Sequence, residues 1–277
     1  MTPGYHALHH AAAWLDLSAR GRIVALGRDR ARLLHNLTSN DIKKLTPGEG
    51  CYAFLLNPQG RIQADLNVLC FPDHFLLDTE PELREKVHHH IKRYIIADQL
   101  ELEDVTLQTA CIALEGPTAS AILPLPAADY AHAPWQDSTV ARVTVTGQPG
   151  ALVFCPAEKK ADIITRLESA GALPATPEDA RMVRIENGRP RYGEDITDTS
   201  LPQETQQMHA VSFTKGCYLG QEIVERIRAR GHVNRKLVRL ELESTQPPEG
   251  AEITSTTVSP ATGKIIALAY VRQRQGQ

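Results

Sequence analysis

The sequence has little of what marks membrane, secreted or nucleic-acid-binding proteins. It contains no apolar run of about 18 residues, the length that a membrane-spanning helix needs. Its N-terminus lacks the basic segment and the apolar core of a signal peptide. The net charge of -3 and the pI near 6.4 give no overall basic field that would attract nucleic acid. We therefore expect a cytoplasmic protein without membrane or direct nucleic-acid contacts.

Cysteine is too scarce and too scattered for a disulfide framework or a local metal site. The number of cysteines is odd, and no two of them form a C-x-x-C motif. Three adjacent histidines, residues 88–90, fall in a predicted helix, where successive side chains point about 100° apart and cannot share one metal ion. The sequence therefore predicts no metal site. The five cysteines are Cys51, Cys70, Cys111, Cys155 and Cys217.

Strands and helices that alternate without the rhythm of a parallel sheet predict the α+β fold class. The 277 residues are enough for two or three domains. Thr79 and Glu82 have the spacing of a capping box, which predicts that a helix begins there. Thr176 is the expected N-cap of a later helix that ends at Gly188. The helices predicted most clearly cover about residues 29–37, 79–95, 176–188 and 221–231.

A β-hairpin is predicted around the turn Asn57–Gly60. Alternation with a period of two along its second strand separates an apolar face from a polar face. The apolar face holds Ile62, Ala64, Leu66, Val68 and Cys70, and the polar face holds Gln63, Asp65 and Asn67. Asp65 and its polar neighbours are therefore expected to point away from the hydrophobic core.

The most informative stretch is KGCYLGQE, which comprises residues 215–222. Its last three residues are expected to open a helix, and Gly216 and Gly220 allow a positive φ or a close approach of the backbone. Cys217 would then stand just before a helix N-terminus and beside Lys215, and both features favour the thiolate. These observations fit a reactive cysteine, and they also fit a small buried residue at a turn.

A basic cluster follows this stretch. It fits a solvated helix face, and it also fits contact with an anionic ligand tail or with RNA. Its members are Arg226, Arg228, Arg230, Arg235, Lys236 and Arg239.

KGCYLGQE resembles the signature of the YgfZ family, folate-binding proteins that support iron–sulfur enzymes. Four further segments agree with this resemblance in order and spacing: LLHNLTSNDI, LLNPQGRIQADLNVL, RIENGRPRYGEDI and LPQE. The family is related to the T protein of the glycine cleavage system, a tetrahydrofolate-dependent aminomethyltransferase. The resemblance extends from about residue 21 to about residue 270, and its motif residues are Lys215, Gly216, Cys217, Tyr218, Gly220, Gln221 and Glu222.

The resemblance implies three subdomains around a central hole in which the folate sits. The first two would be mixed α/β, partly interleaved in sequence, and would occupy residues 1–234. The third would be a small β-barrel over residues 235–277. This barrel looks truncated, because the sequence stops soon after IIALAYV.

Four residues are candidates for folate binding, and the resemblance implies three of them. Glu186 matches the glutamate of the T protein's R-x-E-x-G motif, which hydrogen-bonds the pterin ring. Tyr192 matches the tyrosine of the T protein's Tyr-Gly-x-Asp motif, and Arg235 resembles an arginine that contacts folate. Asn67, on the polar face of the hairpin strand, completes the set.

The hairpin strand departs from the T protein at a position that matters for catalysis. The T protein carries paired aspartates there, one of them essential, whereas this sequence has Ala64 and Asp65. The T protein also lacks the Cys-Tyr pair that stands here as Cys217 and Tyr218. These differences favour the YgfZ family, with a functional thiol at Cys217 and with Asp65 as the other candidate catalytic residue.

The resemblance therefore implies a tetrahydrofolate-binding protein that assists the assembly or repair of iron–sulfur enzymes, including tRNA-modifying ones. Its expected partners are folate, polyglutamylated or carrying a one-carbon unit, and iron–sulfur enzymes or their assembly proteins. Two alternatives stay open: a folate-dependent aminomethyltransferase or demethylase of the T-protein type, and an iron–sulfur scaffold or carrier. Whether the protein is an enzyme depends on which of these holds.

Overall fold

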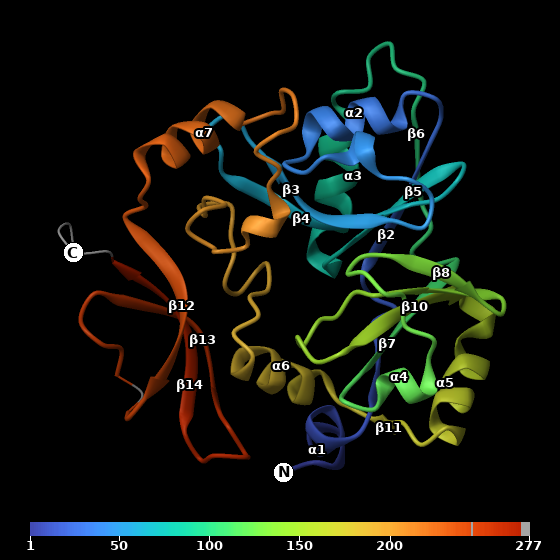
Figure 1. The fold of residues 1–277 in the computed structure, drawn as a ribbon, viewed down its shortest axis with the longest axis vertical. Coiled ribbons are helices and arrows are strands. Elements are labelled where there is room, and N and C mark those ends of the chain that lie inside the picture. Colours follow the sequence, from blue (N-terminus) through green and yellow to red (C-terminus); the bar gives the residue numbers. More distant parts are fainter. Residues whose placement is uncertain (245, 273–277) are drawn as a thin grey trace.

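The computed structural model describes residues 1–244 and 246–272. Three β-sheets with helices packed around them make up the molecule (Figure 1), and the predicted α+β class is confirmed. Within the described residues, no helix is long and apolar enough to cross a membrane.

The first sheet has five strands in the order β3-β4-β5-β2-β6, all paired antiparallel. Its strands are β2 (Gly21–Leu26), β3 (Gly50–Leu56), β4 (Ile62–Cys70), β5 (His74–Thr79) and β6 (Glu101–Asp104). The helical elements connected to it are α2 (Arg30–Leu37), η1 (Ile42–Lys44), η2 (Pro81–Leu83) and α3 (Arg84–Lys92).

The second sheet has six strands in the order β11-β1-β7-β10-β9-β8. Strand β1 comes before the five-stranded sheet in the sequence, and the other strands of this second sheet come after it. The chain therefore leaves the second sheet after β1 and returns to it at β7. The strands are β1 (Ala13–Asp16), β7 (Thr109–Glu115), β8 (His132–Trp135), β9 (Ser138–Ala141), β10 (Gly150–Pro156) and β11 (Leu173–Pro174). The helical elements are α1 (Pro3–His10), α4 (Ala119–Ile122), η3 (Ala157–Lys159) and α5 (Lys160–Ser169).

The remaining chain joins these two parts to a third sheet. Helix α6 (Pro177–Glu186) contacts α1 and the third sheet, and η4 (Met208–Ala210) lies against β3. After α7 (Gln221–Arg230) come β12 (Arg235–Leu242), β13 (Ala251–Val258) and β14 (Ile265–Arg272). These strands form an antiparallel sheet in the order β12-β14-β13 where the sequence predicts a small barrel. Residues 245 and 273–277 of the predicted barrel lie outside the described residues.

Local sequence signals predicted most helix boundaries correctly. The capping box of Thr176 and Asp179 is present at the start of α6, and Gly231 ends α7 with a φ of 73°. The capping box expected at Thr79 and Glu82 is wrong. Thr79 is the last residue of β5, and its hydroxyl donates a 2.8 Å hydrogen bond to the carbonyl oxygen of Asp65 instead of capping a helix.

The two faces of β4 separate as predicted. All five apolar residues of the predicted inner face belong to the hydrophobic core beneath the five-stranded sheet. On the opposite face, Asp65 and Asn67 line a large cavity. The hairpin thus carries the core on one side and the candidate site on the other.

Candidate functional site

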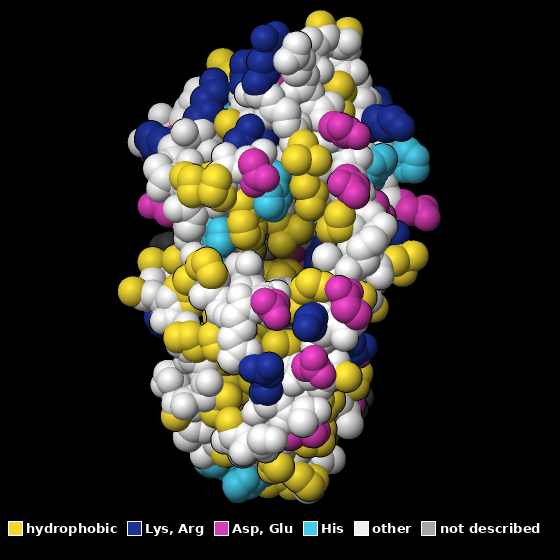
Figure 2. Space-filling model, turned by 90° about the vertical axis from the view of Figure 1, so that its right-hand side faces the viewer, with side chains coloured by type: hydrophobic (Ala, Val, Ile, Leu, Met, Phe, Trp, Pro, Cys, Tyr) yellow, Lys and Arg dark blue, Asp and Glu magenta, His cyan; other side chains and the backbone are white. Residues whose placement is uncertain are grey.

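A cavity of about 680 Å³ lies between the five-stranded sheet, β1 and α6. Trp14 and Leu15 of β1 and Ala180 of α6 contribute apolar walls, while Tyr52 and Asp65 come from the hairpin. The molecule is visibly hollowed between its two halves, and hydrophobic side chains gather around the recess (Figure 2). A concave, largely apolar site with a few polar groups is what a small-molecule site requires.

Asp65 is the buried acid of this cavity. The hydroxyl of Tyr52 donates a 2.8 Å hydrogen bond to its Oδ2, whereas its Oδ1 is buried without a hydrogen-bond partner among the described residues. Burial raises the pKa of Asp65 to about 6, and the negative charge of Glu80 adds to the rise. The bond from Tyr52 opposes it. Asp65 therefore has an unused acceptor atom and exchanges a proton near neutral pH.

Asn67 is held in place beside Asp65. Its side-chain amide donates a 2.7 Å hydrogen bond to Oδ2 of Asp78, which is fully buried. Arg20 completes the arrangement with bonds of 2.8 and 2.9 Å to the same carboxylate. Asn67 thus lines the cavity with an amide that is already engaged.

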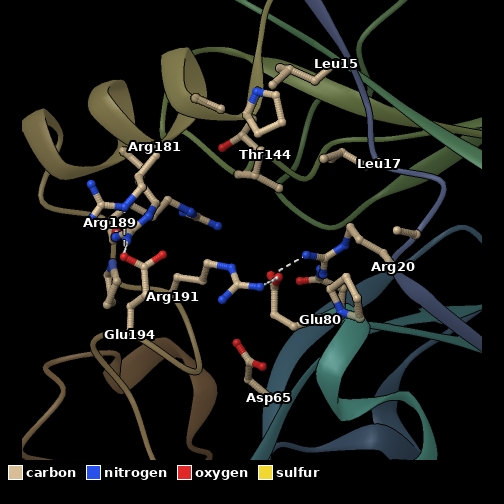
Figure 3. A pocket seen from close by; sticks show the side chains of 18 of the residues that line it. Leu15, Leu17, Arg20, Asp65, Glu80, Thr144, Arg181, Arg189, Arg191 and Glu194 are labelled. Carbon is tan, nitrogen blue, oxygen red and sulfur yellow. Dashed lines mark hydrogen bonds and ion pairs between the residues drawn. The ribbon is translucent and has the colours of Figure 1, made fainter. Parts of the chain in front are cut away.

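Glu80 connects two arginines on the wall nearest Asp65. Arg20 pairs with one of its oxygens, and Arg191 lies 2.9 Å from the other (Figure 3). Burial alone would raise the pKa of Glu80, but the charges of Arg20 and Arg191 lower it. Glu80 therefore stays ionised, and its charge helps to hold a proton on Asp65.

The opposite wall carries a second set of ion pairs. Arg184 of α6 lies 2.7 Å from both Glu194 and Asp195, and Arg181 lies 3.0 Å from Glu194. Asp195 is fully buried and accepts a 2.6 Å hydrogen bond from Thr254 of β13. This wall thus ties α6 to the third sheet.

Three aromatic rings, those of Tyr52 on β3, Tyr130 and His209, stack on one another. Tyr52 and His209 lie 5.3 Å apart with an interplanar angle of 23°, and Tyr130 lies 6.4 Å from Tyr52 at 16°. Tyr52 and His209 both line the cavity. Their near-parallel planes provide a surface on which a flat ring can stack.

Comparisons with known proteins agree with this architecture. The family model described as the GCVT N-terminal domain matches residues 3–215. The chain belongs to this family.

Its relatives cover almost the whole chain. An aminomethyltransferase of Rubrobacter xylanophilus is 30% identical over 96% of this chain and 78% of its own length. An aminomethyltransferase of a Nostoc species is 27% identical over 98% of this chain and 80% of its own length. The solved structure of the glycine cleavage system aminomethyltransferase T from Bartonella henselae superposes with a TM-score of 0.86, with 20% identity, over 97% of this chain and 80% of that one. At this identity the structural likeness concerns the fold.

The other folate-binding residues expected from the sequence do not line the cavity of this GCVT-family chain. The carboxylate of Glu186 accepts a 2.6 Å hydrogen bond from the hydroxyl of Tyr5 and lies 2.8 Å from Nε2 of His9, both on α1. Burial, together with the bond to Glu186, raises the pKa of Tyr5 to about 12. Glu186 therefore joins α6 to α1.

Tyr192 and Arg235 are also engaged elsewhere. Tyr192 is buried in the core of the five-stranded sheet, and its hydroxyl accepts a 3.3 Å hydrogen bond from Lys86. Arg235 begins β12, where it pairs with Glu204 and Glu252 at 3.4 and 3.0 Å. Neither side chain borders the cavity.

Lys215 anchors the KGCYLGQE stretch. Its side chain is buried, and its ammonium donates to the backbone carbonyls of His35, Thr38 and Asn40, the last two at 2.6 and 2.8 Å. Burial lowers the pKa of Lys215 to about 7. The sequence-based expectation was that this ammonium stabilises a thiolate at Cys217. In the structure, the ammonium instead binds carbonyl oxygens at the C-terminal end of α2.

Cys217 is the one exposed cysteine of the five. Helix α7 begins at Gln221 with Gly220 as its N-cap, so three residues separate Cys217 from the helix. The predicted helix start at residues 220–222 is confirmed, and Cys217 precedes it in a loop in which Tyr218 turns inward to the core. A Cβ on Gly220 would lie 2.6 Å from the carbonyl oxygen of Asn57, which explains the glycine.

The remaining cysteines are shielded. Burial raises the pKa of Cys51 to about 12, and it also raises the pKa of each of the others. Among the described residues, no group of three or more His, Cys, Asp or Glu side chains is arranged to hold a metal ion. The other cysteines are Cys70, Cys111 and Cys155.

Sequence reasoning missed the arginines of the cavity. Arg20, Arg189 and Arg191 all line it, yet they come from segments separated by more than half of the chain. No local motif links Arg20 to the other two. The GRPR stretch at residues 188–191, inside the quoted segment RIENGRPRYGEDI, is the one signal that could have indicated them.

Proposed function

We propose that the cavity binds a reduced folate and that the protein performs a folate-dependent one-carbon transfer of the aminomethyltransferase type. The observation that carries this proposal is Asp65, a buried carboxyl with a pKa raised to about 6 and an unpartnered oxygen beside the cavity. The GCVT family generally binds tetrahydrofolate, and relatives over most of the chain are aminomethyltransferases.

The residues present fit a folate. A cavity of about 680 Å³ falls within the range of roughly 300–1,000 Å³ typical of cofactor sites. Tyr52 and His209 offer stacked rings, and Trp14 and Leu15 supply apolar surface. The free Oδ1 of Asp65 can accept a hydrogen bond from a ring N–H.

When bound, a tetrahydrofolate supplies the nitrogen atoms that carry the one-carbon unit. The chain itself supplies a proton-exchanging group. Because its pKa is near 6, Asp65 is mostly ionised at neutral pH and can still accept and return a proton during the reaction. Tyr52 fixes the orientation of that carboxylate through its hydrogen bond to Oδ2.

Glu186, Tyr192 and Arg235 belong to this proposal through the family resemblance alone, since none of them borders the cavity. We also infer a functional division at residue 234. Residues 1–234 would form the folate-binding region. Residues 235–277, beginning with β12, would form an appended region.

Calorimetry and a turnover assay test the proposal together. We expect wild-type protein to bind tetrahydrofolate and its 5-formyl and 5,10-methylene forms. Asp65→Asn should keep its folate affinity within a few fold but lose about 10²–10⁴ in the rate of one-carbon transfer, as expected when a general acid–base group is removed. Asp73→Asn, an exposed acid beside His74, is the matched control. Wild-type protein that binds no folate, or full transfer by Asp65→Asn, would contradict the proposal.

A second candidate function rests on the exposed thiol of Cys217. KGCYLGQE favours the YgfZ branch, and with it a folate-linked role in the assembly or repair of iron–sulfur enzymes, tRNA-modifying ones included. Lys215 and Tyr218 are both buried, so they fix the loop on either side of Cys217 while its thiol stays accessible. Such an anchored, exposed cysteine suits a contact with a partner protein.

Complementation tests this second function. Cys217→Ala should fold and bind folate like wild type, yet fail to restore iron–sulfur enzyme activity in cells that lack the native protein. Cys51→Ala, at a half-buried site, is the control. Full rescue by Cys217→Ala would remove the thiol from the function.

A further inference from the structure

Arg189 stands apart from the other arginines of the cavity. Arg20, Arg181, Arg184 and Arg191 each have a carboxylate partner. Within residues 1–244 and 246–272, no carboxylate oxygen lies within 4.0 Å of the Arg189 guanidinium. A half-buried cation that lines a cavity without an anion beside it is available to an anionic ligand.

The backbone of Arg189 is fixed, although its side chain has no carboxylate partner among the described residues. Its N–H donates a 2.8 Å hydrogen bond to the carbonyl oxygen of Arg184, whose guanidinium in turn donates to the carbonyl oxygen of Arg189 at 3.1 Å. Gly188, with a φ of 68°, makes the turn out of α6, and Pro190 follows directly. Because the backbone is already fixed, only the side chain of Arg189 has to be ordered when it binds a ligand.

The neighbours of Arg189 are aromatic or already satisfied. Its positive charge acts on the phenols of Tyr52 and Tyr130 and on the imidazole of His209, so it lies beside the stacked rings. Its charge also acts on Glu115, which is fully buried. Its oxygens accept hydrogen bonds from the backbone N–H groups of Val145 and Thr146 at 2.6 and 3.0 Å. Glu115 therefore accepts hydrogen bonds from the backbone of residues 145 and 146 and does not pair with Arg189.

The cavity thus holds two groups of opposite kind that both interact with Tyr52. Asp65 presents a free acceptor oxygen. Arg189 presents donors without a carboxylate partner among the described residues. A ligand that places an amine or ring N–H at Asp65 and a carboxylate at Arg189 would satisfy both groups.

We propose that Arg189 is a carboxylate-binding subsite of the cavity. This inference rests on the proposed function in taking Asp65 as the reacting end of the site. The carboxylate could come from the glutamate of the folate itself or from a separate small amino acid bound beside the folate.

Calorimetry with three probes distinguishes these sources. The probes are 5-formyltetrahydrofolate, the primary amide of 5-formyltetrahydropteroate, which lacks the glutamate and carries no carboxylate, and N-methylglycine titrated into folate-loaded protein. Each is measured with wild type, Arg189→Gln and Arg226→Gln, an exposed arginine of α7 outside the cavity. Thermal unfolding of each variant confirms that it is folded.

We expect Arg189→Gln to weaken at least one carboxylate-bearing probe about tenfold or more, with the pteroate amide unchanged and Arg226→Gln like wild type. Loss confined to the folate assigns the subsite to the glutamate of the cofactor, and loss confined to N-methylglycine assigns it to a separate amino acid. Wild-type affinities of Arg189→Gln for all three probes, or an equal loss for folate and the pteroate amide, would overturn the inference. If wild type binds neither folate nor the pteroate amide, the proposed function fails. The N-methylglycine titration, then made into the unloaded protein, still decides the subsite.

Discussion

The hydroxyl of Tyr52 on β3 donates a 2.8 Å hydrogen bond to Oδ2 of Asp65 on β4, on the face of the hairpin that lines the cavity. The two residues are diagonal neighbours, since Phe54 is the residue directly opposite Asp65 in the strand register. The bond leaves the second oxygen of Asp65 free. It also partly offsets the effect of burial, and the resulting pKa of Asp65 is raised to about 6. The pair thereby sets both the orientation and the proton affinity of the acid.

Tyr52→Phe should therefore raise the pKa of Asp65 further. A hydrogen bond to a charged group contributes about 1.5 kcal/mol or more, which corresponds to about one pKa unit. In the pH profile of folate-dependent transfer, the limb that reports Asp65 should move to higher pH by about one unit. Tyr94→Phe, a half-buried tyrosine outside the cavity, is the control and should keep the wild-type profile. If this limb does not shift in Tyr52→Phe, the hydrogen bond from Tyr52 does not set the pKa of Asp65.

Asp65 should cost the folded protein stability above pH 6. Its pKa is 3.8 as a reference value and about 6 in the folded state, so between these values the folded state binds more protons than the unfolded state. Its favourable contribution is therefore complete below pH 3.8 and is lost as the pH rises through 6.

Asp65→Asn should consequently be more stable than wild type at pH 8, by up to about 3 kcal/mol, and the gain should shrink at pH 5. Urea unfolding at the two pH values measures the difference. Asp73→Asn, at an exposed site, should show no such gain. A variant that is less stable than wild type at pH 8 would mean that the carboxylate is well compensated in the fold.

Lys215→Met should destabilise the protein by about 1–3 kcal/mol. The substitution keeps an apolar side chain of similar length but leaves the carbonyl oxygens of His35, Thr38 and Asn40 without their buried donor. Urea unfolding compared with Lys43→Met, an exposed lysine of η1, measures the effect. Equal stability of the two variants would show that the ammonium does not anchor the loop.

Glu186→Ala should lower stability by about 1–3 kcal/mol, because it leaves the buried hydroxyl of Tyr5 without its acceptor. Glu178→Ala, at an exposed position of the same helix, is the control. The same variant tests the sequence-based role of Glu186, which predicts a loss of folate affinity worth about 1.5–3 kcal/mol. Unchanged stability would contradict the α1–α6 contact, and unchanged calorimetric affinity would confine Glu186 to that contact.

The sequence predicted those features that depend on neighbouring residues. Alternation along residues 62–70 identified the polar face that carries Asp65, and Thr176 with Asp179 identified the start of α6. Each of these signals acts within one element, where spacing and capping determine the geometry.

The features that the sequence did not predict depend on contacts between distant segments. Arg20 and Arg191 converge on Glu80 from distant segments of the chain, and nothing in their local sequence specifies that contact. Lys215 was expected to face its neighbour Cys217. It turns to α2 because the carbonyl oxygens at that helix end need donors. Glu186 likewise contacts His9 of α1, which is 177 residues away in the sequence.

The crystal structure of the protein with 5-formyltetrahydrofolate tests the central claim most directly. We predict that the folate fills the cavity, with a ring or bridge N–H within hydrogen-bond distance of Oδ1 of Asp65 and with its pterin against the ring of Tyr52 or His209. A folate bound elsewhere, or one that fills the cavity without touching Asp65, would contradict the account.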